Sequence, residues 1–284
     1  MKHQYQHNVT TSFAMWLDHH LLEKGEAYQN QTGVLSYYSD TRLPSSYKAF
    51  GSLYKQWVFD SSITGATVPS GVYVNGSFKG RGDGLVIDYL NGRVLATGNG
   101  IPTGATVTGS FAVKDYNIYL TNENEEDLII ENNNLAANEK FPWTGKYVQP
   151  YDQAIPAIYL ITEGFHNTPF ALGGEDESRS HFKSVIFADS PYSLDGVLSI
   201  FADTMQKAFK LKDFSTYPIN EFGDVKTSPY IYDDYYDNPT PQEQMFIDHV
   251  VVSKLKDSRS RTQNPKSFVG FADFEIIKYR YPRA

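Results

Sequence analysis

Carboxylates are the side chains of this sequence that could do chemistry without a recognisable motif. The chain contains no Gly-rich phosphate loop, no Gly-x-Ser-x-Gly elbow and no His-Glu-x-x-His helix. A glycosidase needs only two carboxylates at a suitable separation in space, which a sequence does not record. Asp88 and Asp189, each at the end of a predicted strand, are the best candidates for such a pair. Nothing else in the sequence indicates catalysis, so we expect no enzymatic activity and no cofactor.

Metal binding has equally little support. His19 and His20 are adjacent, so on a helix their side chains point about 100° apart. Asp233, Asp234 and Asp237 lack the alternating oxygen ligands and the glycine of a calcium loop. Three further histidines lie in or beside predicted strands, where we expect structural roles: His166, His181 and His249. Cysteine is absent, which removes thiolate ligands, thiol nucleophiles and disulfides.

Two short segments of opposite charge are the strongest candidates for a functional surface. Residues 229–239 place tyrosines beside aspartates, and residues 254–261 form the only basic cluster. Tyrosine combines a large rigid contact area with a polar end, which suits a protein interface. We expect both segments to be exposed loops that meet, or face different partners, across subunit boundaries. The candidate interface residues are Tyr230, Tyr232, Asp233, Asp234, Tyr235, Tyr236, Lys254, Lys256, Arg259 and Arg261.

Composition narrows the classes of protein that remain. A chain of 284 residues can bury two modest cores. The formal charge of −8 argues against general nucleic-acid binding, but it suits a surface that DNA must pass without sticking. Residues 1–10 lack the apolar core of a signal peptide, and no window approaches the roughly 18 apolar residues of a membrane helix. Tyr and Phe number 21 and 18, which favours β-rich structure and extensive protein contacts.

The first half of the chain predicts a helix followed by a small β-sandwich or barrel. Residues 1–30 hold a flexible arm, residues 1–9, and then a helix that Thr11 or Ser12 can cap and Gly25 can end. Residues 31–122 read as short strands separated by turns. In this β-rich domain we expect one strand over residues 72–78, a turn at Arg81-Gly82-Asp83, and a hairpin over residues 85–96 with a type I′ turn at Asn91-Gly92.

The second half predicts an α+β domain over residues 154–284, after a linker over residues 123–153 that contains one short strand at residues 128–130. Two strands over residues 155–161 and 182–188 lead into a helix capped by Ser190, with Pro191 at its first position. Apolar residues at steps of three and four extend that helix to Phe209. Two final strands over residues 246–253 and 268–279 complete a mixed four-stranded sheet with one packed amphipathic helix.

This second half resembles the tail terminator, or tail completion, proteins of long-tailed bacteriophages. The resemblance lies in the order of elements and in these segments: Ile155-Pro156-Ala157-Ile158-Tyr159-Leu160, Val185-Ile186-Phe187-Ala188, Ser190-Pro191-Tyr192-Ser193-Leu194-Asp195 and Asp273-Phe274-Glu275-Ile276-Ile277-Lys278-Tyr279. Two features depart from the family, namely the inserted β-rich domain and the long loop over residues 212–244. A compound neck protein would explain both.

The resemblance implies a homo-oligomeric ring, usually six-fold, at the head–tail junction of a virion. Such a protein is made in the host cytoplasm, contacts the tail tube and connector proteins, and lets genome DNA pass without sequence-specific binding or contact with a membrane. Three alternatives remain open from sequence: another neck or baseplate component, a hydrolase with a carboxylate pair, and a β-sandwich that binds a glycan or receptor. Exposed coplanar indoles among Trp16, Trp57 and Trp143 would favour the glycan-binding reading.

Overall fold

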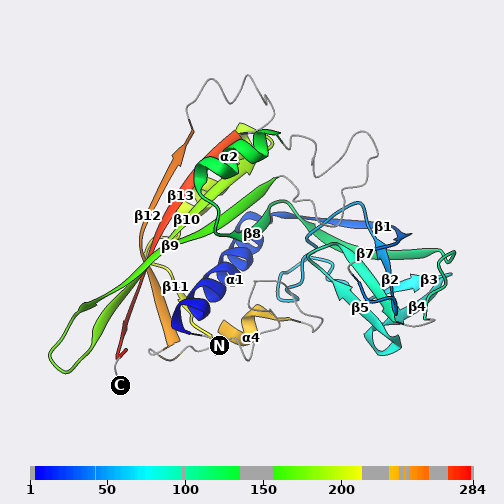
Figure 1. Ribbon diagram of the computed structural model, residues 1–284, viewed down its shortest axis with the longest axis horizontal. Helices are drawn as coiled ribbons and strands as arrows, with labels where there is room; N and C mark the ends of the chain where they lie inside the picture. The colour runs from blue at the N-terminus through cyan, green and yellow to red at the C-terminus, as the bar shows by residue number, and fades with distance from the viewer. Residues whose placement is uncertain are drawn as a thin grey trace.

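The computed structural model shows two β-sheets held on either side of one N-terminal helix (Figure 1). It describes residues 4–41, 43–97, 100–134, 156–212, 230–236, 240, 243–255 and 268–282. The fold is therefore mixed α and β and rich in sheet, with the N-terminal helix that the sequence predicts. Within the described residues, no helix is both long enough and apolar enough to cross a membrane.

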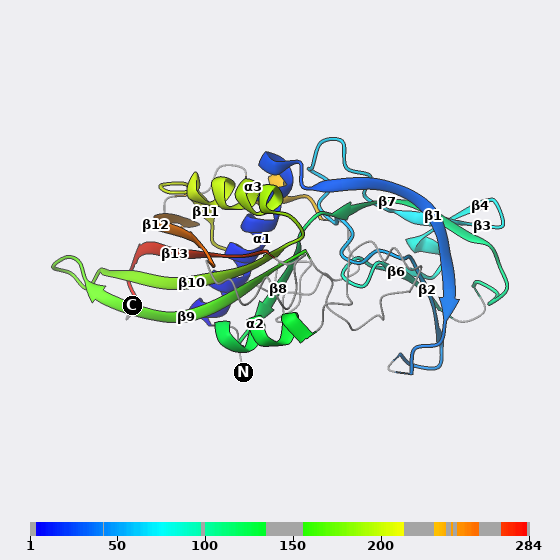
Figure 2. The same cartoon turned by 90° about the horizontal axis from the view of Figure 1, so that it is seen from above.

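The first sheet forms the β-rich half and has seven strands in the order β4-β3-β7-β1-β2-β6-β5. β1 (Tyr28–Tyr38) pairs with β7 through its first part and with β2 through its last three residues, so the sheet folds over at β1 (Figure 2). The other strands are β2 (Tyr47–Gly51), β3 (Gly71–Val74), β4 (Ser77–Gly80), β5 (Leu85–Asp88), β6 (Arg93–Thr97) and β7 (Val107–Lys114). Trp57, stacked on Phe111 at 4.3 Å, lies in the core of this half.

Two Asn-Gly pairs of this half, Asn75-Gly76 and Asn91-Gly92, differ from the expectation. Residues 72–78 are a hairpin and not one strand, because Asn75 and Gly76 both adopt positive φ and turn β3 into β4. The predicted hairpin of β5 and β6 is present, but only Gly92 of its turn has positive φ, and a four-residue loop joins Asp88 to Arg93. Arg81-Gly82-Asp83 forms a single 3₁₀ turn, η1 (Arg81–Asp83).

The second sheet has six strands in the order β11-β12-β13-β10-β9-β8, against the four expected. Its strands are β8 (Asn117–Thr121), β9 (Ala157–Pro169), β10 (Asp176–Ala188), β11 (Ala208–Lys210), β12 (Gln244–Lys254) and β13 (Phe268–Arg280). β8 pairs parallel to β9 and all other neighbours are antiparallel, so the sheet is mixed as predicted. We expected the β-rich domain to extend to residue 122. The strand pairing instead places β8 in the second sheet.

Helices cover the two faces of the second sheet unequally. α1 (Tyr5–Gly25) and α3 (Pro191–Ala202) pack on one face, where Phe13 meets Phe182 at 4.9 Å and Phe274 at 5.1 Å. α2 (Glu125–Asn134) lies on the opposite side (Figure 2) and seats Leu128 against Tyr159 and its apolar neighbours. The strand predicted at residues 128–130 is thus part of a helix, and α2 covers only one end of its face.

α1 is the element that both sheets share. Its buried residues surround the helix on all sides: Val9, Thr11, Ser12, Phe13, Met15, Trp16, Leu17, Asp18, His20, Leu21 and Leu22. A helix buried all round belongs to a core and not to a surface. The predicted arm and the predicted cap are therefore wrong, because the helix already begins at Tyr5 and Val9 is fully buried. Ser12 lies within it and accepts a hydrogen bond from the Lys212 backbone N–H at 3.1 Å.

α3 begins as the sequence predicts and ends earlier. The Ser190 hydroxyl accepts a hydrogen bond from the Ser193 N–H at 3.1 Å, and Pro191 occupies the first position. The helix stops at Ala202, and Phe209 belongs to β11, where it is fully buried. The apolar spacing past Ala202 therefore comes from an edge strand that pairs with β12 and not from a longer helix.

Candidate interaction surface

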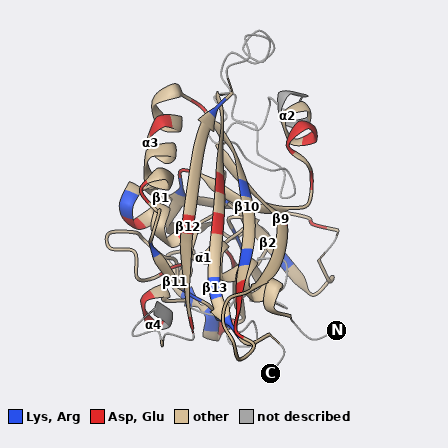
Figure 3. Cartoon of the chain, turned by 90° about the vertical axis from the view of Figure 1, so that its left-hand side faces the viewer, with Lys and Arg blue, Asp and Glu red and all other residues tan. Residues whose placement is uncertain are grey.

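The end of the second sheet that α2 leaves open carries a charged surface, here called the acidic face. The register places alternate residues of β10 opposite alternate residues of β13, with Arg179 across from Ile277, His181 from Glu275 and Lys183 from Asp273. Glu163, Asp248, Asp273, Glu275 and Glu177 supply carboxylates to this face, and Arg179 and Lys183 supply cations. Figure 3 shows these charges along β10, β12 and β13.

Arg179 is held at the centre of the acidic face by three carboxylates. Its guanidinium donates to Glu275 and Glu177, and to Asp248 at 3.2 Å. The hydrogen bonds to Glu275 and, second, to Glu177 raise the pKa of Arg179. The hydrogen bond between Arg179 and Glu275 also lowers the pKa of Glu275. The one arginine of this face is thus neutralised by its neighbours.

Lys183, the other cation of the acidic face, is paired in the same way. Its ammonium lies 2.8 Å from Glu125 of α2 and 3.7 Å from Glu163 of β9. The hydrogen bond to Glu125 raises the pKa of Lys183. Burial raises the pKa of the neighbouring Asp273, although Lys183 acts in the opposite direction. Both cations are engaged, so the face presents net negative charge.

β9 and β10 extend past the body of the protein as an arm (Figures 1 and 2). At its end, Phe170 is 59 % exposed and Leu172 is completely exposed. Phe170 contacts Tyr279 at 4.5 Å between ring centroids, and Arg280 lies 3.7 Å above the Tyr5 ring at the base of the arm. Apolar side chains this exposed, at the end of a projecting hairpin, are candidates for a contact with another molecule.

The predicted tyrosine-aspartate interface is only partly at the surface. Tyr230 and Tyr232 are buried, which contradicts the expected exposed loop, while Asp233 and Asp234 on α4 (Tyr232–Tyr236) are exposed. The side chains of Tyr235 and Tyr236 lie outside the described residues, as does Asp237. The burial follows from packing against a distant segment, since the Ser61 N–H donates to the Tyr230 carbonyl at 2.9 Å.

Of the predicted basic cluster, the structure describes Lys254, which is half-exposed at the end of β12 and forms an ion pair with Asp195 of α3. Lys256, Arg259 and Arg261 lie outside the described residues. The structure therefore leaves the expected contact between the two charged segments as a prediction.

A histidine-carboxylate pair missed by the sequence reasoning joins α1 to the β-rich half. The His19 Nδ1–H donates to the Asp60 carboxylate at 2.7 Å, and the imidazole stacks on Tyr232 at 4.3 Å. Burial alone would raise the pKa of Asp60, but hydrogen bonds from His19, Ser62 and the Tyr232 N–H lower it. Ser62 donates to Asp60 and not to His19, so this is no nucleophile–base pair. The contact joins α1, the segment around Asp60 and the start of α4.

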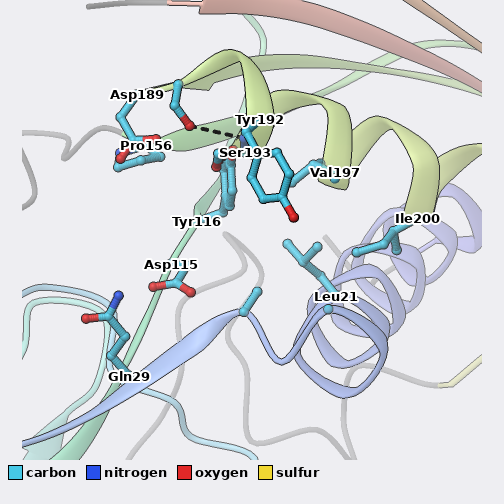
Figure 4. A pocket seen from close by; sticks show the side chains of 14 residues that line it. Leu21, Gln29, Asp115, Tyr116, Pro156, Asp189, Tyr192, Ser193, Val197 and Ile200 are labelled. Carbon is cyan, nitrogen blue, oxygen red and sulfur yellow. Dashed lines mark hydrogen bonds between the residues drawn. The ribbon is translucent and has the colours of Figure 1, made fainter.

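A cavity of about 430 Å³ lies where the end of α1, the start of β9 and the first turn of α3 meet (Figure 4). Tyr116 and Ser193 share a hydrogen bond in its wall, and burial raises the pKa of Tyr116. Asp189 lines this cavity, while Asp88 lies in the other sheet and binds Arg93 at 2.6 Å. The structure does not bring Asp88 and Asp189 into one site, so the carboxylate pair considered from sequence is wrong.

The remaining candidates for chemistry do not gather into a site among the described residues. His166 and His181 stack at 5.5 Å on the sheet, and among the described residues no three metal-ligating side chains gather at one point. Trp16 and Trp57 are 4 % and 1 % exposed, which excludes them as a sugar-stacking platform. Trp143 lies outside the described residues.

The chain is thus a mixed α and β protein with a negatively charged sheet face. Among known proteins, no family model matches this chain and no curated protein shows significant sequence similarity to it.

Proposed function

We propose that this chain is a non-enzymatic structural protein of a bacteriophage virion, a neck or tail terminator subunit that forms a ring at the head–tail junction. The observation that carries the proposal is the acidic face. A ring that genome DNA crosses needs a lumen that does not bind phosphate, because basic walls would retain the DNA. A sheet face on which Arg179 and Lys183 are both neutralised by carboxylates meets that need.

Two further features support the proposal. The chain order β9, β10, α3, β12 and β13 is the order that the resemblance to tail terminators implies. The exposed Phe170 and Leu172 give each copy an apolar anchor at the end of its arm, and rings are built from such head-to-tail contacts. The glycan-binding alternative has less support, because Trp16 and Trp57 are buried and the exposed Tyr73 and Phe78 rings meet edge to face at 67°.

Light scattering and negative-stain microscopy of the purified chain, over a range of concentrations, test the ring. We expect closed rings, or a monomer that converts to rings as concentration rises. A monomer at every concentration that also binds polysaccharide would contradict the proposal and favour the glycan-binding module.

A matched pair of charge reversals tests the lumen. Glu275→Lys places a cation on the acidic face, whereas Asp203→Lys makes the same change of charge on an exposed position at the end of α3. We expect wild type and Asp203→Lys not to retain DNA at physiological salt, and Glu275→Lys to retain it in a salt-dependent manner. Equal DNA retention by both variants would show that the acidic face has no special exposure to DNA.

A further inference from the structure

Both long edges of the second sheet are paired over only part of their length. β8 pairs with residues 157–161 of β9, and β11 pairs with residues 244–246 of β12. Among the strands that the structure describes, none lies beside the outer edge of residues 162–169 of β9 or of residues 248–254 of β12. Most residues of both segments are exposed. Unpaired backbone donors and acceptors on an exposed edge are a template for another strand.

The two open segments fit each other in direction and length. β12, β13, β10 and β9 alternate in direction across the sheet, so β9 runs antiparallel to β12. A second copy in the same orientation therefore brings its β9 antiparallel to the β12 of the first. Each open segment begins beside a β-bulge, and beyond the bulge each is regular to its end. The open part of β12 begins just past the residues that β11 covers, and the open part of β9 ends at Pro169, which has no N–H to continue a ladder.

Side-chain direction then selects one register. Residues directly opposite each other must share a face of the sheet. His166 lies opposite Arg179 on the acidic face, and Val251 lies opposite Asp273 on the same face, so these two residues can pair. In that register Phe165 meets Val252 on the helix-packed face. The contact joins an exposed aromatic to an aliphatic side chain.

We propose that a second copy of this chain occupies the open edge of β12, with residues 162–169 of its β9 antiparallel to residues 248–254. The proposal rests on the ring function proposed above and names the contact that builds it. The contact is heterologous, because each copy offers β9 on one side and β12 on the other, and such contacts generate rings or filaments.

The stagger of the proposed contact is compatible with closure. Within one copy Val251 lies level with Ile161, whereas across the contact it lies opposite His166 of the next copy. The shift along the strands equals four regular residues, because one residue of β9 between Ile161 and His166 is the extra residue of the β-bulge. Each copy is thus shifted by about 13 Å, at about 3.3 Å per residue, over four strands that span about 19 Å. This ratio corresponds to a strand tilt of about 35°, at the lower end of the range at which sheets close into barrels, about 35–45°.

Engineered cysteines test the register, since the chain contains no cysteine of its own. Directly opposite residues of an antiparallel pair have Cα atoms about 4.5–5.5 Å apart, which a disulfide spans. The double variant His166→Cys/Val251→Cys should form disulfide-linked multimers under mild oxidation. Within one chain these residues are separated by β10 and β13, so an internal disulfide cannot form. The control His166→Cys/Val252→Cys has the same number of thiols but places the second on the opposite face, and should link poorly.

The outcomes separate the contact from the ring function. A ladder of linked species in the paired variant, with little linking in the control and wild-type melting in both, would support the edge contact. Rings seen by microscopy without linking of the paired variant would overturn the edge contact and leave the ring proposal standing. Absence of rings together with absence of linking would overturn both. Equal linking of the two variants would also overturn the register, because it would indicate random collision.

Discussion

The carboxylate of Asp18 on α1 and the ammonium of Lys114 on β7 form a buried ion pair between the central helix and the first sheet. Both carboxylate oxygens accept from Nζ, at 2.6 and 2.7 Å, and the two side chains are only 9 % and 6 % exposed. Lys114 Nζ also lies 4.4 Å above the Phe59 ring. On its other sides the same helix packs against the second sheet through Phe13. The pair therefore sets how the two halves of the chain are joined.

Removing one partner of this pair should destabilise the protein strongly. Lys114→Met leaves Asp18 buried without its counter-ion, and such changes cost about 3–5 kcal/mol of unfolding free energy. Urea denaturation followed by circular dichroism measures the loss. The matched control is Lys24→Met, which breaks an exposed pair with Glu23 and should cost less than about 1 kcal/mol. The double variant Asp18→Leu/Lys114→Met should recover most of the loss. A double variant as unstable as the sum of the singles would show that the charges are not coupled.

Acid should weaken the fold through His20. Burial is the main cause that lowers the pKa of His20 to about 4, and the positive charge of Lys207 is the second. The Lys207 Nζ donates to His20 Nε2 at 3.2 Å. Below about pH 6.5 the unfolded chain binds a proton at this position and the folded chain does not, so stability is complete above pH 6.5 and falls as the pH drops toward 4. The loss from this group is at most about 3 kcal/mol.

The measurement is the unfolding free energy between pH 4 and 7 for wild type, His20→Gln and Lys207→Met. We expect His20→Gln to flatten the dependence, whatever its stability at pH 7. Lys207→Met should flatten it in part, because removing the neighbouring cation raises the pKa of His20. Parallel curves for wild type and His20→Gln would refute this account.

The sequence predicted correctly those elements that depend on residues close together along the chain. Ser190 and Pro191 specify the start of α3 by hydrogen bonding and fixed φ, and both act within one turn. The paired strands β9 and β10 follow from an apolar run and a Gly-rich turn. The end of α3 was missed because Phe209 is placed by its pairing in β11 with β12, and no spacing rule reports a partner so far along the chain.

The candidate surface was less predictable for the same reason. Tyr230 and Tyr232 look polar and exposed beside their aspartates, yet contacts with Asp60 and His19 bury them. The acidic face depends on register, which brings Arg179 beside Glu275 from a strand far along the sequence. Alternation of charged residues along β10 was its one visible signal, and it could not identify the partner strands.

Two glycines in the first sheet should respond differently to the same substitution. Gly76 and Gly92 both have positive φ, at 86° and 59°, so alanine is strained at either position by about 1 kcal/mol. A Cβ at Gly76 would meet nothing within 4 Å, whereas at Gly92 it would lie 1.8 Å from the Tyr54 carbonyl oxygen. We expect Gly92→Ala to lower the urea midpoint several-fold more than Gly76→Ala. Equal shifts would mean that the Tyr54 backbone moves aside freely.

Loss of the α3 cap should reduce stability by a modest and specific amount. Ser190→Ala removes the hydroxyl that accepts from the Ser193 N–H, and cap losses of this kind cost about 1 kcal/mol. Ser190→Asp restores an acceptor and adds a negative charge at the helix N-terminus, so it should recover the loss. Unfolding free energies of the two variants at pH 7 decide the matter. Because Ser190 also lines the cavity beside Tyr116, equal destabilisation by both variants would assign the effect to packing there and not to the cap.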